Sequence, residues 1–132
     1  MFTWIDGGSA MIQTTELLAW LEQQIGRDEK AYAIHAGAQT ACQLHKDGRI
    51  TGGLKYDEGR LMAFTTLRRR VRKAGAEAPD TLAAMIHAEA ARWQATLRTY
   101  QQAEQPSIPW LAYSQGGVDA MLETLDFLNR PA

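Results

Sequence analysis

The chain has 132 residues, of which 45% are hydrophobic and 22% charged, and its 14 Lys and Arg nearly balance its 15 Asp and Glu. A chain of this length makes a single domain, residues 1–132, and buries enough surface to fold without disulfides or metal ions. The near-neutral charge argues against a globally basic nucleic-acid-binding protein. No apolar run approaches the length of a membrane span. Because the single Cys42 cannot form an intrachain disulfide, we expect a reducing, cytoplasmic compartment.

Residues 1–12 differ from the rest of the chain because they carry no clear helical spacing. They also lack the basic and apolar regions of a secretory signal. We therefore expect a short strand or a loosely attached N-terminal arm there. A first helix is predicted over residues 14–25, and Gly26 is expected to end it. The apolar face of this helix comprises Leu17, Leu18, Leu21 and Ile25.

A second helix is predicted over residues 28–46, with Asp28 as its N-cap. Its expected core face comprises Ile34, Ala38, Ala41 and Leu44. A third helix is predicted over residues 54–74, ended by Gly75. Its apolar face comprises Leu54, Leu61, Phe64, Leu67 and Val71.

A fourth helix is expected from residue 80 or 81 to about residue 104, and a fifth over residues 110–129, after two prolines. The face of the fourth comprises Leu82, Ile86, Ala90, Trp93, Leu97 and Tyr100. The face of the fifth comprises Leu111, Val118, Met121, Leu122, Leu125 and Leu128. The pattern predicts an all-α fold, a compact bundle of about five helices.

Two stretches share one pattern: YDEGRLMAF begins at Tyr56 and YSQGGVDAM at Tyr113. In each, a glycine and an alanine lie four residues apart, on one face of a helix. The residues concerned are Tyr56, Gly59 and Ala63, and Tyr113, Gly116 and Ala120. Since glycine inside a helix costs about 1 kcal/mol relative to alanine, a close contact is the expected reason for it. We predict a contact between the third and fifth helices or across a dimer interface; a ligand groove is the alternative.

The strongest charge feature is a basic run of five cations in six residues. Its members are Arg68, Arg69, Arg70, Arg72 and Lys73. Cations suit the last turns of a helix because the helix dipole favours them there, so a solvated or ion-paired face explains the run. The alternatives are a contact for nucleic acid or an acidic protein, or a site for a small anion, since arginine suits phosphate.

Sites for chemistry are sparse in this sequence. Cys42, His45 and His87 are the weak candidates for a transition-metal site, because the one Cys-x-x-His pair has no second pair to complete it. No nucleophile motif or phosphate loop is present. We expect no cofactor and no catalytic residue. Trp4 and Trp110 fall outside the confident helix interiors. We expect them to plug the ends of the bundle; if exposed, they would be binding hot spots.

The sequence therefore predicts a small non-enzymatic helical interaction protein. It would bind a protein partner or itself through the small-residue helix faces, and it would have no membrane association. The character of the chain suits an accessory protein of a phage or mobile element. Two alternatives stay open: a nucleic-acid-associated factor that uses the basic run, and a small-ligand or metal-binding bundle.

Overall fold

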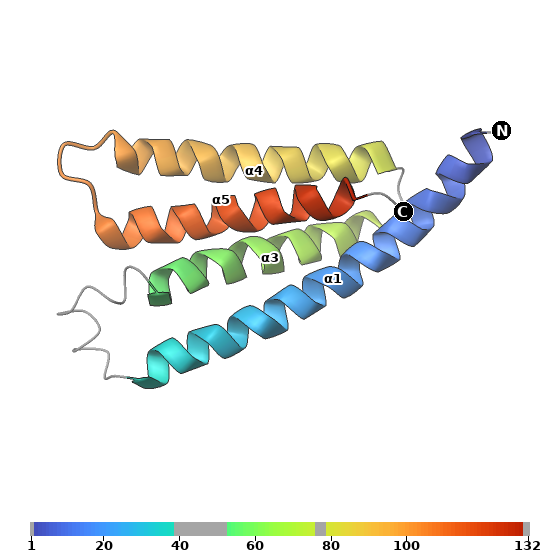
Figure 1. Ribbon diagram of the computed structural model, residues 1–132. Coiled ribbons are helices and arrows are strands. Elements are labelled where there is room, and N and C mark those ends of the chain that lie inside the picture. The colour runs from blue at the N-terminus through green and yellow to red at the C-terminus, as the bar shows by residue number, and fades with distance from the viewer. Residues whose placement is uncertain (1, 39–52, 76–78, 131–132) are drawn as a thin grey trace.

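The computed structural model describes residues 2–38, 53–75 and 79–130, which form four helices. These are α1 (Phe2–Ala38), α3 (Lys55–Ala74), α4 (Pro79–Gln101) and α5 (Ile108–Leu128). The all-helical class is confirmed, and no strand occurs among these residues. Helices α3 and α5 lie in the middle and make the most extensive contact, while α4 packs on α5 and α1 packs on α3 (Figure 1).

The prediction of separate first and second helices is wrong, because residues 14–25 and the described part of the second predicted helix, residues 28–38, belong to one continuous helix, α1. Gly26 does not end a helix, and Asp28 is not an N-cap. The buried positions Leu21, Ile25 and Asp28 follow one another at spacings of three or four residues across Gly26. A glycine costs about 1 kcal/mol in a helix, whereas burying a Leu or Ile side chain contributes roughly 1.5–3 kcal/mol. Burial of these side chains against α3 therefore outweighs the tendency of Gly26 to end the helix.

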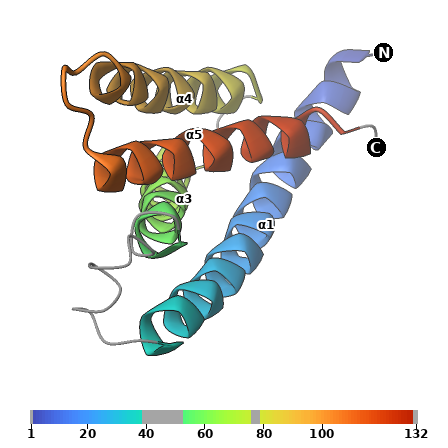
Figure 2. The same cartoon turned by 60° about the vertical axis from the view of Figure 1, so that its left-hand side comes forward.

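Helix α1 also replaces the strand or arm that we expected in residues 1–12, since the helix begins at Phe2. The expected core face of the second predicted helix fails at Ile34, whose side chain is 70% exposed. Ala41 and Leu44 lie outside the described residues. Figure 2 shows that α1 runs at an angle to the other helices. Among the described helices, none contains a stretch long and apolar enough to cross a membrane.

The bounds of the other three helices follow their local signals closely. Helix α3 ends where Gly75 adopts a φ of 70° and donates its backbone N–H to the carbonyl of Val71 at 3.1 Å. A left-handed φ favours glycine, so the C-terminal signal is genuine. Helix α4 begins at Pro79 and stops at Gln101, three residues before the predicted end. Helix α5 begins two residues earlier than predicted, after Ser107.

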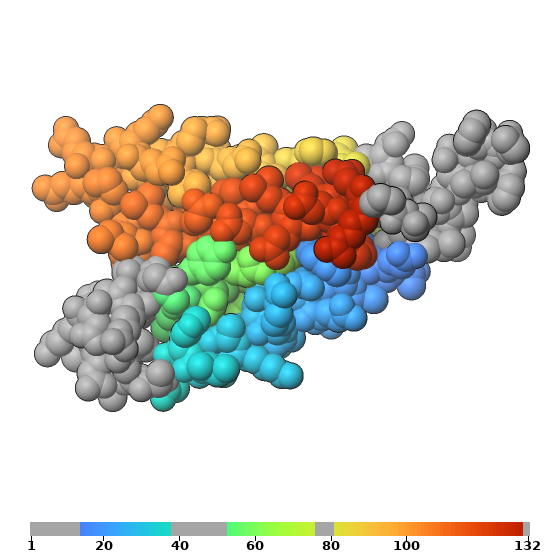
Figure 3. Space-filling view, viewed as in Figure 1, coloured from blue at the N-terminus to red at the C-terminus, as the bar shows by residue number. Residues whose placement is uncertain are grey.

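One hydrophobic core runs through the bundle and joins all four helices. Its fully buried large side chains include Leu17 and Leu21 of α1, Phe64 and Leu67 of α3, Leu82 and Ile86 of α4, and Met121 of α5. Trp20 closes the core between α1 and α5, where its ring stacks on Phe127 with the centroids 4.8 Å apart. Leu122, predicted to face inward, is 44% exposed. Figure 3 shows α5 lying across one face of the molecule, below α4 and above α3 and α1.

Candidate functional site

The two Tyr-x-x-Gly motifs face each other where α3 meets α5. A Cβ built on Gly59 would lie less than 3.0 Å from the backbone carbonyl oxygen of Tyr113. A Cβ built on Gly116 would likewise lie less than 3.0 Å from the backbone carbonyl oxygen of Tyr56. The contact is reciprocal, since each glycine lies on the backbone of the other motif's tyrosine. The two motifs therefore contact each other within one chain. This is the contact between the third and fifth predicted helices, which the sequence offered beside a dimer interface.

The alanines and a third glycine complete this packing. Ala63 and Ala120 are 1% and 0% exposed. Gly117 lies at the contact between α5 and α4, where a Cβ would overlap the indole ring of Trp93 on α4. The small residues of α5 thus accept the α3 backbone on one side and an α4 side chain on the other. The glycines and alanines of both motifs are therefore buried between helices of one chain.

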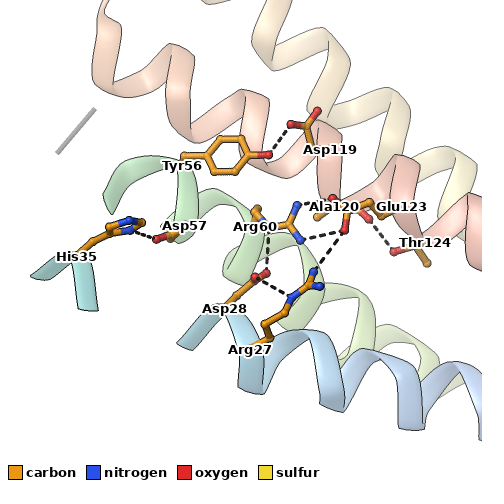
Figure 4. A network of polar contacts seen from close by, with 10 residues as sticks. All are labelled: Arg27, Asp28, His35, Tyr56, Asp57, Arg60, Asp119, Ala120, Glu123 and Thr124. Atoms are coloured by element: carbon orange, nitrogen blue, oxygen red, sulfur yellow. Dashed lines mark hydrogen bonds and ion pairs between the residues drawn. The ribbon is translucent and has the colours of Figure 1, made fainter. Parts of the chain in front are cut away.

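Beside this contact lies a layer of polar side chains from three helices, drawn in Figure 4. We call the polar layer the set Asp28, Tyr56, Asp57, Arg60, Asp119 and Glu123. At its centre Arg60, only 6% exposed, donates its Nε–H to Asp28 at 3.0 Å and both Nη groups to Glu123 at 2.6 and 3.0 Å. A buried guanidinium with two carboxylates ties α1, α3 and α5 together.

Two further links extend the polar layer on either side of Arg60. The Tyr56 hydroxyl donates to Asp119 at 2.5 Å, joining α3 to α5. The Asp57 carboxylate lies 2.5 Å from Nδ1 of His35, joining α3 to α1. Asp57 is 6% exposed, so a partner for its carboxylate is a structural requirement. The polar layer fixes how the three helices sit against one another.

Burial shifts the pKa values of several groups in and beside this layer. Burial raises the pKa of Asp28, and the nearby charge of Arg60 only partly offsets it. Burial alone would lower the pKa of Arg60, but its bonds to Glu123 and the charge of Asp28 raise the pKa above its usual value. Burial and the hydrogen bond to Asp119 raise the pKa of Tyr56 to about 12. Arg60 therefore stays charged, while burial disfavours the charged form of Asp28.

A pocket with a volume of about 460 Å³ lies between α1, α3 and α5. Its lining is mainly apolar and aromatic, with one carboxylate: Tyr32, Glu58, Leu61, Met62, Thr65, Trp110 and Tyr113. Met62 and Trp110 are 49% and 43% exposed, so two large apolar side chains are open to solvent at this one pocket. This pocket is called the aromatic pocket below.

A cation of the chain itself occupies the rim of the aromatic pocket. The Lys55 ammonium lies 2.9 Å from the Glu58 carboxylate and 5.3 Å from the centre of the Trp110 ring. Glu58 also accepts a hydrogen bond from the Tyr32 hydroxyl at 3.4 Å. Burial and the negative charge of Glu58 raise the pKa of Tyr113. The rim thus stabilises a primary ammonium by charge and by cation–π attraction.

Several cations of the basic run make ion pairs with carboxylates of neighbouring helices. Arg68 and Arg72 both donate to Glu22 of α1, at 2.7 and 2.9 Å. Arg70 lies 3.1 Å from the buried carboxylate of Glu89 on α4. Arg69 and Lys73 are exposed and make no ion pair with another described residue. Three of the five cations therefore hold α3 to its neighbours.

The candidate metal ligands are not brought together within the described part of the chain. His87 is exposed on α4, and Cys42 and His45 lie outside the described residues. The residues that are described contain no group of three or more His, Cys, Asp or Glu side chains suited to a metal ion. Comparison of the chain with protein-family models, with curated proteins and with solved structures finds no match.

Sequence reasoning missed the aromatic pocket and most of the polar layer. The pocket joins Tyr32, Met62 and Trp110, which come from three helices and share no local pattern. Of these, Trp110 alone carried a signal, because it lies at the start of a helix after two prolines. The bond between Asp28 and Arg60 spans 32 positions, and helical spacing gives no information on such pairs.

Proposed function

We propose that this protein is a non-enzymatic helical binding protein and that the aromatic pocket is its partner-binding surface. The observation that carries the proposal is the exposure of Met62 and Trp110 at the edge of an apolar pocket. Trp is among the residues most often found at the energetic centre of protein interfaces. The small-residue faces, which the sequence suggested for this role, are engaged between α3 and α5.

The charges around the aromatic pocket favour a basic partner segment. Glu58 is the carboxylate that lines this pocket, and its present cation is the Lys55 ammonium at 2.9 Å. We propose a protein segment that inserts an apolar side chain beside Trp110 and presents a Lys or Arg to Glu58. Such complementarity raises the association rate and selects against acidic partners.

A titration with designed peptides tests both halves of this proposal. The probe is an amphipathic helical peptide of Leu and Lys, and its counterpart has Glu in place of every Lys. Fluorescence anisotropy of the labelled peptides should show saturable binding of the Leu/Lys peptide only. Equal binding of both peptides would contradict a preference for basic segments.

A matched pair of variants ties that binding to the pocket. Met62→Ser removes a large apolar side chain at the pocket, and Leu122→Ser removes one of similar exposure on α5 that does not line it. We expect Met62→Ser to weaken binding by about tenfold, the equivalent of roughly 1.4 kcal/mol, and Leu122→Ser to leave it unchanged. Equal losses in the two variants would refute the proposed surface. A dimer in solution that Met62→Ser dissociates would instead assign the surface to a second copy of the chain.

A further inference from the structure

A second pocket lies between α3, α4 and α5 and has a volume of about 320 Å³. Its lining differs from that of the aromatic pocket because it brings two arginines together: Thr66, Arg70, Glu89, Arg92, Trp93 and Thr96. Tyr113 lines both pockets and separates them. The volume lies at the lower end of the range for small-molecule sites.

A single buried carboxylate holds the two guanidinium groups side by side. The Glu89 side chain is 6% exposed, and its Oε2 lies 3.1 Å from Nε of Arg70 and 2.5 Å from Nη2 of Arg92. One negative charge thus faces two positive charges. Each guanidinium has five N–H donors in a planar fork, so donors remain on both for a second anion.

A nearby lysine adds to the excess of positive charge at this pocket. Lys73 lies three residues after Arg70 on α3, so it is a neighbour on the same side of that helix. Lys73 is exposed and has no ion-pair partner among the residues that the structure describes. The pocket therefore carries net positive charge, while its one carboxylate is already engaged.

An aromatic wall completes the pocket and is held rigidly. The indole of Trp93 lies over Gly117, where any side chain would overlap it. The ring of Tyr113 packs against Trp93 at 5.4 Å between centroids. A flat apolar surface next to two oriented guanidinium groups suits a planar ring that carries a negative group.

We propose that this second pocket binds a small planar aromatic anion, a ring bearing a phosphate or carboxylate. The ring would lie against Trp93, and the anionic group would accept hydrogen bonds from Arg70 and Arg92. This inference stands apart from the proposed partner surface, since the two pockets share only Tyr113. It also gives Arg70, the one member of the basic run in this pocket, a role beyond pairing with Glu89.

The probes for this site separate the ring from the charge. Phenyl phosphate carries both, benzamide carries only the ring, and inorganic phosphate carries only the charge. Saturation-transfer NMR and calorimetry should show phenyl phosphate binding at least about tenfold more tightly than either of the other two, since losing a charge-assisted hydrogen bond alone costs about that factor. Equal affinity of benzamide or of inorganic phosphate would overturn the proposal.

Two variants and a control locate the site. Arg70→Gln and Arg92→Gln should each weaken phenyl phosphate binding by about tenfold or more, whereas Arg98→Gln, which changes an exposed cation of α4 outside the pocket, should not. Phenyl phosphate should also change the tryptophan fluorescence, and Trp93→Phe should abolish that change. A loss in Arg98→Gln equal to the others, or no saturable binding of phenyl phosphate to the wild type, would reject the site.

Discussion

Replacing Gly59 by alanine should destabilise the protein, although alanine is the better helix former. The gain in helix propensity is about 1 kcal/mol. Against it, the new methyl group would lie less than 3.0 Å from the Tyr113 carbonyl oxygen, which belongs to the backbone and cannot rotate away. Helices α3 and α5 would have to separate, and a gap of 0.5–1 Å forfeits roughly a quarter to a half of the dispersion attraction across the contact.

The net effect can be estimated from these opposing contributions. Overpacking costs about 1–3 kcal/mol in typical cores, and a backbone obstacle places this case at the upper end or beyond. After the gain in propensity, we expect Gly59→Ala to lose about 2 kcal/mol in the free energy of unfolding. Urea denaturation followed by circular dichroism at constant pH measures this loss.

Gly26→Ala is the matched control for that measurement. Gly26 is also inside a helix, but a Cβ there would meet nothing within 4 Å. We expect this variant to gain up to about 1 kcal/mol, the propensity alone. Opposite signs for the two substitutions would support the close contact. A gain in both would refute the reasoning.

The reciprocity of the contact makes the double variant informative. Once α3 and α5 have moved apart to accommodate Gly59→Ala, Gly116→Ala should need little further separation. We therefore expect the double variant to lose less unfolding free energy than the two single variants lose together. The difference, a coupling of about 1 kcal/mol, is in the range usual for residues in direct contact. Simple additivity would show that the two glycines do not share one helix separation.

Three further predictions concern the polar layer and the rim of the aromatic pocket. Arg60→Met should cost about 3–5 kcal/mol at neutral pH because it leaves the buried carboxylate of Asp28 with only the exposed Arg27, 4.0 Å away, as a partner. The cost of Arg60→Met relative to wild type should shrink toward acidic pH. Because the pKa of Asp28 is raised in the folded protein, the charge of Asp28 opposes folding at pH values above that pKa. Below the unfolded value of about 3.9 the carboxyl is neutral in both states, so this opposition is absent. Urea titrations of both proteins at several pH values test this, and a cost that grows as the pH falls would contradict it. Tyr56→Phe should remove from the ultraviolet titration the tyrosine with a pKa of about 12. Because the unfolded tyrosine ionises near pH 10, wild type should lose stability relative to this variant between about pH 10 and 12, and parallel alkaline unfolding curves would count against the bond. Lys55→Gln should strengthen binding of the Leu/Lys peptide, since the internal cation no longer competes for Glu58, and weaker binding would show that Lys55 is not a competitor.

Much of the fold could be predicted from the sequence because its signals are local. The apolar spacing of α3 and the glycine after it determine where that helix lies and ends. The paired Gly-x-x-x-Ala motifs predicted a close contact for a physical reason, the cost of glycine in a helix. Gly26 misled for the same reason, because a cost near 1 kcal/mol is readily outweighed by burial of Leu21 and Ile25 on α3.

The candidate sites could not be predicted in the same way. Each pocket is built from side chains of three helices, and its lining depends on the angles at which those helices cross. The sequence offers Glu89 as one of several acidic partners for the basic run, but only the packing of α3 on α4 brings Arg70 and Arg92 to the same carboxylate. The sequence suggested an ion-paired face for the basic run but could not name Glu22 as a partner, because Glu22 lies 46 positions before Arg68.

The position of the bound peptide is the most direct test of the proposed partner surface. Backbone amide shifts recorded by NMR during titration with the Leu/Lys peptide would map it. We predict that the largest changes cluster at Leu61, Met62, Thr65 and Tyr113, around the aromatic pocket. Saturable changes centred on the exposed Leu122 instead, or none that saturate, would contradict the assignment of the aromatic pocket as the partner-binding surface.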